Sequence, residues 1–93
     1  MDVEFDTIKR ARILTLRRLD IADAGKVFNG FHLTRRDEKH SGEESRYNTV
    51  GLLGDIVVVV TWTPRNGLRR IVTMWKANDR ERAKYHEQHQ RSG

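Results

Sequence analysis

Four basic residues at the ends of two expected strands are the first feature of this sequence that could do chemistry. They are Arg65, Arg69, Arg70 and Lys76. No acidic residue occurs from 56 to 78 to neutralise them. A guanidinium group matches a phosphate group with two parallel hydrogen bonds and keeps its charge at physiological pH. These side chains therefore predict that the protein binds a polyanion.

A second basic stretch lies near the start of the chain. It holds five basic residues and no acidic one: Lys9, Arg10, Arg12, Arg17 and Arg18. Asp6 predicts the start of a helix here, because its carboxylate can accept bonds from the first free backbone N–H groups. Helical spacing predicts that Ile8, Ala11 and Leu14 are buried, with Ile13 beside them. The basic side chains would form the other face, which is either a polyanion-binding surface or an ordinary solvated helix face.

A hairpin of two long strands is the clearest structural signal. Residues 56–65 form an apolar run rich in β-branched residues, and Asn66-Gly67 is typical of a two-residue hairpin turn. A second strand follows up to residue 77. We expect an α+β fold in which this hairpin lies within an antiparallel sheet of about four strands.

Shorter elements flank the hairpin. The expected elements are a short strand at 3–5, a helix at 20–28 that begins at Asp20 and buries Ile21, Ala24 and Phe28, an edge strand at 31–36, a mobile loop at 37–44, a strand at 45–50 that contains Arg46, a hairpin loop at 51–55 and a final helix from Asp79 to about Gln88. Asn78 and Glu81 have the spacing of a capping box for the final helix. Residues from about 89 onward are expected to fray.

Composition limits the class of protein. The chain has 93 residues, with 18 Lys+Arg against 13 Asp+Glu and a formal net charge of +5. This length predicts a single domain over 1–93 with a small core, and the charge favours an acidic partner. Without cysteine, disulfides and thiolate metal ligands are excluded. No membrane span or signal peptide is recognisable, so we expect a cytoplasmic protein with no membrane partner.

Several segments, taken together, resemble the BrnT family. They are Glu4-Phe5-Asp6 with Lys9, the 20–28 helix, Arg46-Tyr47-x-Thr49-Val50-Gly51, the valine strand ending Thr63-x-Arg65, Arg70-Ile71-Val72-Thr73, and Lys76-Ala77 followed by Glu81-Arg82-x-x-Tyr85. The resemblance covers roughly residues 3–85. It implies a RelE-like fold and a ribonuclease toxin of a bacterial type II toxin–antitoxin pair, which cleaves RNA, inhibits translation and is neutralised by a BrnA-type antitoxin.

The resemblance also implies a reaction. It predicts a metal-independent endoribonuclease without a cofactor, in which the RNA 2′-OH attacks the adjacent phosphate. Arg65, Arg70 and Lys76 would stabilise the charge on phosphorus. Glu81 and Tyr85 would transfer protons, although the capping box alone explains Glu81 and the apolar side of the final helix explains Tyr85. The wider RNA-binding set is Lys9, Arg10, Arg12, Arg17, Arg18, Arg46, Arg69 and Trp75.

Three places depart from the family pattern. Ile13 stands where the family commonly has Asn, Leu16-Arg17-Arg18 stands for Lys-His-Gly, and Thr73-Met74-Trp75 stands for Ser-Ala-Arg. A second hypothesis is therefore a catalytically weakened homologue that acts as a binding module and corepressor in the antitoxin–DNA complex. A third hypothesis is a basic nucleic-acid-binding domain with no antitoxin.

The resemblance further implies a hetero-oligomer with the antitoxin, which alone would contact DNA. Charge predicts that the antitoxin covers the same basic surface as RNA, built from Arg65, Arg70 and Lys76 with residues 9–18 alongside. His86 and His89 lie three residues apart but lack a third ligand, so no metal site is expected. The two tryptophans, on adjacent strands, would either stack on RNA bases or pack into the core.

Overall fold

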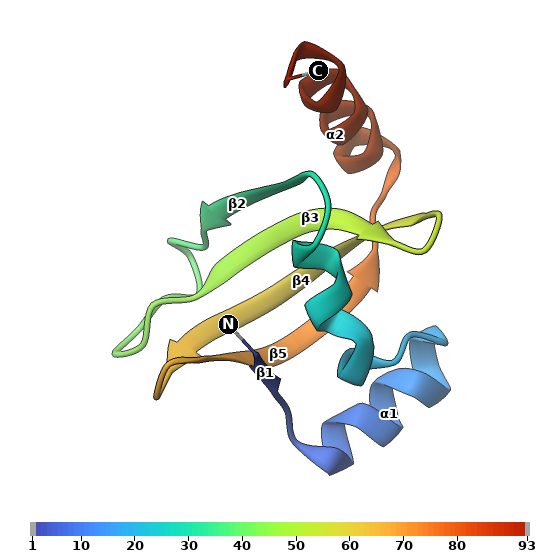
Figure 1. Ribbon diagram of the computed structural model, residues 1–93. Helices are drawn as coiled ribbons and strands as arrows, with labels where there is room; N and C mark the ends of the chain where they lie inside the picture. The colour runs from blue at the N-terminus through green and yellow to red at the C-terminus, as the bar shows by residue number, and fades with distance from the viewer. Residues whose placement is uncertain (1, 93) are drawn as a thin grey trace.

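A computed structural model describes residues 2–92, in which helices lie on both faces of one mixed sheet (Figure 1). In chain order, the elements are β1 (Val3–Glu4), α1 (Thr7–Arg17), the 3-10 helix η1 (Ile21–Phe28), β2 (His32–Arg36), β3 (Tyr47–Leu53), β4 (Ile56–Arg65), β5 (Leu68–Lys76) and α2 (Asp79–Ser92). The predicted α+β class is confirmed. No helix among the described residues is long and apolar enough to span a membrane.

The sheet has five strands in the order β1-β5-β4-β3-β2. Strands β2 to β5 pair antiparallel, as predicted, but β1 adds a parallel edge strand, with Val3 beside Arg69 and Glu4 beside Arg70. The expected count of about four strands is therefore wrong. The short strand expected at 3–5 is present as β1. Its place in the sheet was not predicted, because its partner lies more than sixty residues away in the sequence and is chosen by tertiary contacts.

The valine run of β4 is the centre of the sheet, as predicted. Successive side chains of a strand point to opposite faces. Val58 and Val60 join the core under α1 and η1, while Val57 and Val59 pack with Ala77 and Tyr85 on the face that carries α2. Burial on both faces explains why this strand is a continuous apolar run instead of an alternating one.

The two hairpin turns are both tight. Asn66 and Gly67 have φ of 53° and 77°, as the predicted Asn-Gly turn requires. The expected loop at 51–55 is wrong, since β3 continues to Leu53 and only Gly54 and Asp55 turn. Gly51 is inside the strand because η1 lies directly over it: a Cβ there would come within 2.8 Å of the Val27 side chain.

The segment 20–28 is helical but forms a 3-10 helix. Asp20 caps it by accepting a bond from the Ala22 N–H at 3.0 Å. The buried side chains are Ile21, Ala24 and Val27, every third residue, whereas Phe28 is only partly buried. A 3-10 helix has three residues per turn, so these three side chains lie on one side. The prediction that Phe28 is buried assumed α-helical spacing and is therefore wrong.

Helix α1 begins as predicted, with the Ile8 N–H donating to Asp6 at 2.8 Å. Its burial is reversed, because only Ile13 is buried, whereas Ile8, Ala11 and Leu14 are exposed. Two contacts made by other side chains set this rotation. Arg10 forms two 2.8 Å bonds to Asp20, and Arg17 donates to the hydroxyl of Thr73 and the carbonyl of Met74.

The final helix is longer than expected, and the loop before β3 has internal hydrogen bonds. Helix α2 runs to Ser92, so the prediction that residues from about 89 onward fray is wrong for residues 89–92, and Gly93 lies outside the described residues. An Arg91–Glu87 ion pair at 2.9 Å supports its last turn. The 37–44 loop is irregular, as predicted. The Asp37 N–H donates to the Arg46 carbonyl, the Ser41 hydroxyl donates to the Asp37 carbonyl, and the Arg46 backbone N–H donates to the Ser41 hydroxyl.

Candidate nucleic-acid interface

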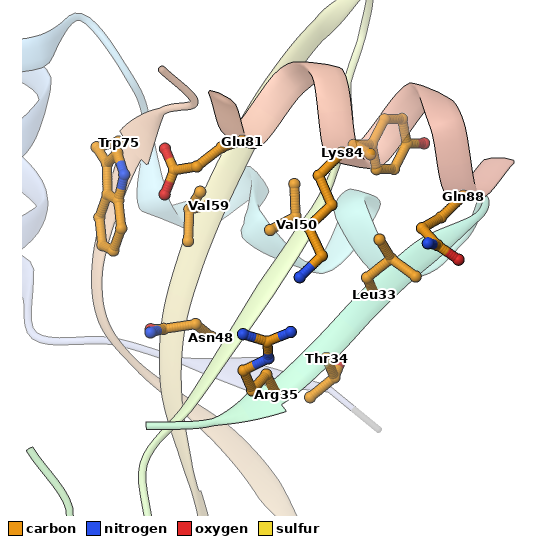
Figure 2. A pocket seen from close by; sticks show the side chains of 11 residues that line it. Leu33, Thr34, Arg35, Asn48, Val50, Val59, Trp75, Glu81, Lys84 and Gln88 are labelled. Atoms are coloured by element: carbon orange, nitrogen blue, oxygen red, sulfur yellow. The ribbon is translucent and has the colours of Figure 1, made fainter. Parts of the chain in front are cut away.

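A cleft of about 580 Å³ lies between α2 and the face of the sheet that α2 covers in part (Figure 2). Its floor is apolar, formed by Leu33, Val50 and Val59 from three neighbouring strands. Polar and charged side chains surround this floor: Thr34, Arg35, Asn48, Glu81, Lys84 and Gln88. The ring of Trp75 closes one end. An apolar base with a few polar groups around it is the usual composition of a ligand site.

Two cations extend into this cleft from opposite walls. Lys84 reaches down from α2, and Arg35 reaches across from β2 (Figure 2). Neither belongs to any of the ion pairs formed within residues 2–92. Two positive charges on opposite walls favour an anion between them.

The end of the cleft near Trp75 carries hydrogen-bonding groups held in place by the fold. The Glu81 side chain accepts a bond from the Asn78 N–H at 2.8 Å, and Asn78 accepts one from the Glu81 N–H at 2.8 Å, which confirms the predicted capping box. Asn48 accepts a bond from the Thr61 hydroxyl at 2.6 Å. Glu81 and Trp75 lie next to each other in Figure 2, so a carboxylate and an aromatic ring share this end of the cleft.

Tyr85 contributes to the inner wall of the cleft through its ring. Its side chain is 1% exposed, and its hydroxyl donates to the Phe31 carbonyl at 2.8 Å. Burial raises the pKa of the phenol, which keeps it neutral. These contacts give Tyr85 a packing role. Packing on the apolar side of the final helix was the predicted alternative to proton transfer.

The three basic residues expected to act together lie apart. Arg65 is beside the β4–β5 turn, and Lys76 is at the far end of β5. Arg70 and Lys76 are six positions apart, roughly 20 Å along an extended strand. Arg70 also pairs with Glu4 of β1 at 3.4 Å, so its neutralising carboxylate comes from a distant part of the chain. The structure thus brings Glu81 and Tyr85 to one cleft but not all five expected catalytic residues.

The basic residues of α1 divide into two groups. Arg10 and Arg17 are held by hydrogen bonds within the protein. The Arg10 guanidinium and the Ala22 N–H both bond to Asp20 and lower its pKa to about 2. Lys9, Arg12 and Arg18 are exposed and belong to none of the ion pairs formed by residues 2–92. None of these residues lines the cleft. The C-terminal end of α1 nevertheless lies near the Trp75 end of the cleft, because Arg17 bonds to Thr73 and Met74, directly before Trp75 in β5.

The remaining expected RNA-binding residues differ in accessibility. The Arg69 guanidinium lies 3.7 Å from the Phe28 ring centroid, and burial lowers its pKa. Trp62 donates to Thr49 at 2.8 Å and stacks on Tyr47, so it packs within the protein. Trp75 is the tryptophan that borders the cleft. Arg46 is half-buried, and its N–H donates to the Ser41 hydroxyl at 3.0 Å.

Among the cleft residues that the sequence-based prediction missed are Arg35, Asn48 and Lys84. Asn48 carried a signal, since it alternates with Tyr47 and Thr49. Arg35 and Lys84 gave no such signal, because no local sequence pattern indicates that α2 and β2 line the same cleft. His89 stacks on Phe31 with ring centroids 4.6 Å apart, and no group of three or more metal-ligating side chains occurs within the described part of the chain.

The fold and the cleft define a small, basic α+β protein with a groove that is lined by Arg35 and Lys84 and bordered by an aromatic ring. Residues 5–81 match the model of a family described as ribonuclease toxin, BrnT, of type II toxin-antitoxin system. The chain belongs to this family. Comparison with curated proteins finds no match. The matched segment ends in the first turn of α2, so Lys84 and Tyr85 lie beyond it.

Proposed function

We propose that this protein is a toxin that cleaves RNA in the cleft between α2 and the sheet and thereby inhibits translation. The observation that carries the proposal is the convergence of Arg35 and Lys84 above an apolar floor, with Trp75 and Glu81 at one end. The family description, a ribonuclease toxin of a type II toxin-antitoxin system, supplies the class of reaction. Its partner is an antitoxin of the BrnA type.

The cleft residues suit cleavage by the RNA's own 2′-hydroxyl. Glu81 takes the 2′-OH proton while the 2′-oxygen attacks phosphorus. Arg35 stabilises the charge on the phosphorane oxygens, since preorganised cations act where charge develops. The bond to the 5′-oxygen then breaks, and Lys84 protonates that oxygen. The products are a 2′,3′-cyclic phosphate and a 5′-hydroxyl, with no metal ion or cofactor needed.

The residues outside the cleft then bind RNA without taking part in chemistry. Trp75 stacks on a base next to the cleaved bond, as aromatic rings do for single strands. Arg65, Arg70 and Arg46, with Arg69 behind them, contact the backbone nearer the β4–β5 turn. Lys76 follows Trp75 at the end of β5, and Tyr85 supports the cleft wall. We take residues 1–93 as one RelE-like, cytoplasmic toxin domain.

The test is RNA cleavage by the purified protein in a chelating buffer. Arg35→Ala and Lys84→Ala should each lower the cleavage rate about a hundredfold, the usual effect of removing one charge-stabilising group. Arg91→Ala, on the same kind of exposed surface but paired with Glu87, is the matched control and should cleave like the unmodified protein. Mass analysis of the products should find cyclic phosphate ends.

Two results would overturn this assignment. Cleavage that stops in EDTA and returns with a divalent ion would require metal chemistry. Full activity in the Arg35→Ala and Lys84→Ala variants would place the reaction elsewhere. A folded protein that binds its antitoxin yet cleaves no RNA would instead support the second hypothesis, a corepressor in the antitoxin–DNA complex.

A further inference from the structure

Helix α1 exposes apolar side chains that its own chain does not cover. Ile8 is 68% exposed, Leu16 is 74% exposed and Leu14 is 44% exposed. Ala11 lies between Ile8 and Leu14 at helical spacing and is exposed as well. We call these four residues, together with Lys9, Arg12 and Arg18, the α1 outer surface. An apolar group of this kind with a polar rim is typical of a protein-binding site.

The helix is fixed in the rotation that exposes this surface. Ile13, on the opposite side, is in the core under the sheet. The two bonds from Arg10 to Asp20, and those from Arg17 to β5, hold the helix from that side. A rotation that buried Ile8 and Leu14 would break these contacts and expose Ile13. The apolar residues therefore stay available to a second molecule.

The charges around this surface select the chemistry of that molecule. Lys9, Arg12 and Arg18 project from it and belong to no ion pair formed within residues 2–92. In a symmetric dimer, these cations would face their own copies, which is unfavourable. RNA phosphates would match the cations, but Ile8 and Leu16 offer no aromatic face to a base. An acidic protein segment with an apolar side satisfies both features.

We propose that the α1 outer surface binds an amphipathic helix of the antitoxin, with apolar residues at helical spacing flanked by Asp and Glu. The proposal rests on the antitoxin partner of the proposed function. The sequence-based prediction placed RNA and the antitoxin on one basic surface, whereas this proposal gives them separate surfaces, because no residue of α1 lines the RNA cleft. The antitoxin is thus anchored at α1, and its affinity does not depend on the cleft cations.

The test measures the affinity of the purified chain for the purified antitoxin encoded beside its gene, by titration calorimetry. The double variant Ile8→Gln/Leu16→Gln should weaken binding at least about tenfold. Lys9→Glu/Arg12→Glu should slow association and reverse its dependence on salt, since long-range attraction sets the association rate. These positions are exposed, so the fold should survive, and circular dichroism checks that it does.

Matched controls come from the same chain. Leu52 and Ile56 are 37% and 41% exposed at the β3–β4 hairpin, and Leu52→Gln/Ile56→Gln should bind the antitoxin as the unmodified chain does. Arg35→Ala/Lys84→Ala should also leave antitoxin affinity unchanged. The proposal is wrong if the cleft variant loses affinity while Ile8→Gln/Leu16→Gln does not, or if the unmodified chain dimerises through α1 on size-exclusion chromatography.

The outcome is independent of whether the cleft cleaves RNA. The Ile8→Gln/Leu16→Gln variant should cleave or bind RNA like the unmodified chain, and loss of RNA binding with intact antitoxin affinity would make α1 a nucleic-acid surface. If the unmodified chain cleaves nothing yet binds antitoxin through α1, the proposed ribonuclease function fails and this inference stands.

Discussion

At the scale of single residues, the contacts of each basic side chain decide what it can do. Arg10, Arg17 and Arg70 each have a partner within the fold, at 2.8, 2.9 and 3.4 Å. Binding a phosphate would require them to give up these bonds, which offsets the gain. Arg35 and Lys84 have no such ion pair within residues 2–92. The same residue types therefore differ in function according to their neighbours.

Tyr85 is the residue for which a structural role and a catalytic role make opposite predictions. Tyr85→Phe removes the bond to the Phe31 carbonyl and leaves that oxygen without this donor, so the free energy of unfolding should fall by about 1 kcal/mol. RNA cleavage should continue at the rate of the unmodified protein. Urea denaturation and the cleavage assay measure the two effects.

Tyr47→Phe is the control for this change. Tyr47 stacks on Trp62, and no hydrogen bond from its hydroxyl occurs within residues 2–92. Its removal should alter neither stability nor cleavage. A loss of cleavage in Tyr85→Phe, at full stability, would return the phenol to the list of proton-transfer groups.

At the scale of elements, side-chain anchors at helix ends set how each helix presents its faces. The Asp20 carboxylate caps η1 and also accepts a hydrogen bond from Arg10 of α1, so one side chain links the two helices. Arg18 ends α1 in the left-handed conformation, with φ of 57°. These contacts, and not the apolar pattern of α1, decide that its Ile8 side faces outward.

The Asp20 contact predicts a pH dependence of stability. Hydrogen bonds from Arg10 and from the Ala22 N–H lower the pKa of Asp20 from 3.8 to about 2. A folded pKa below the unfolded one adds stability at pH values above about 4, and this stability is lost as pH falls towards about 2. Asp20→Asn keeps a capping oxygen but has no charge, so its free energy of unfolding should change less between these pH values.

Urea denaturation at a series of pH values measures this difference. Asp23→Asn is the control, because Asp23 makes only an exposed ion pair with Lys26 at 3.4 Å. It should follow the pH dependence of the unmodified protein. Identical pH profiles for Asp20→Asn and the unmodified protein would contradict the Arg10–Asp20 link.

At the scale of the whole molecule, the net charge of +5 is distributed over separate regions. One is the cleft with Arg35 and Lys84, another is the β4–β5 turn with Arg65, and a third is the α1 outer surface. The first two lie on the sheet and suit a strand of RNA that passes along it. The third lies on α1, which contributes no residue to the cleft, and its apolar side chains suit a protein.

This distribution predicts how RNA binding responds to salt. Each phosphate contact to a single strand contributes about 0.7 to the slope of log affinity against log salt concentration. Arg65→Ala should lower the slope by about that amount. Arg70→Ala should lower it less, because Arg70 already pairs with Glu4 and releases fewer counterions on binding. Fluorescence anisotropy with a 2′-O-methyl RNA, which cannot be cleaved, gives both slopes.

Arg91→Ala serves again as the control and should leave the slope unchanged. Equal slopes for Arg65→Ala and the unmodified protein would mean that RNA does not reach the β4–β5 turn. The path of the RNA would then be confined to the cleft.

The sequence by itself determined the elements whose signals are local. The valine run predicted the central strand, Asn66-Gly67 predicted its turn, and Asp6, Asp20 and Asn78 predicted where the helices begin. Each of these depends on backbone geometry or on hydrogen bonds between neighbours in the chain, which a short stretch of residues specifies. The order of the segments also predicted the family.

Only the tertiary structure decided how distant segments meet. It added β1 to the sheet, turned the Ile8 side of α1 to solvent, and placed Lys84 opposite Arg35. It also separated Arg70 from Lys76 and gave Arg70 a carboxylate from β1. Such outcomes depend on packing and on ion pairs between residues far apart in the chain, so the candidate site emerged only when α2 was folded over the sheet.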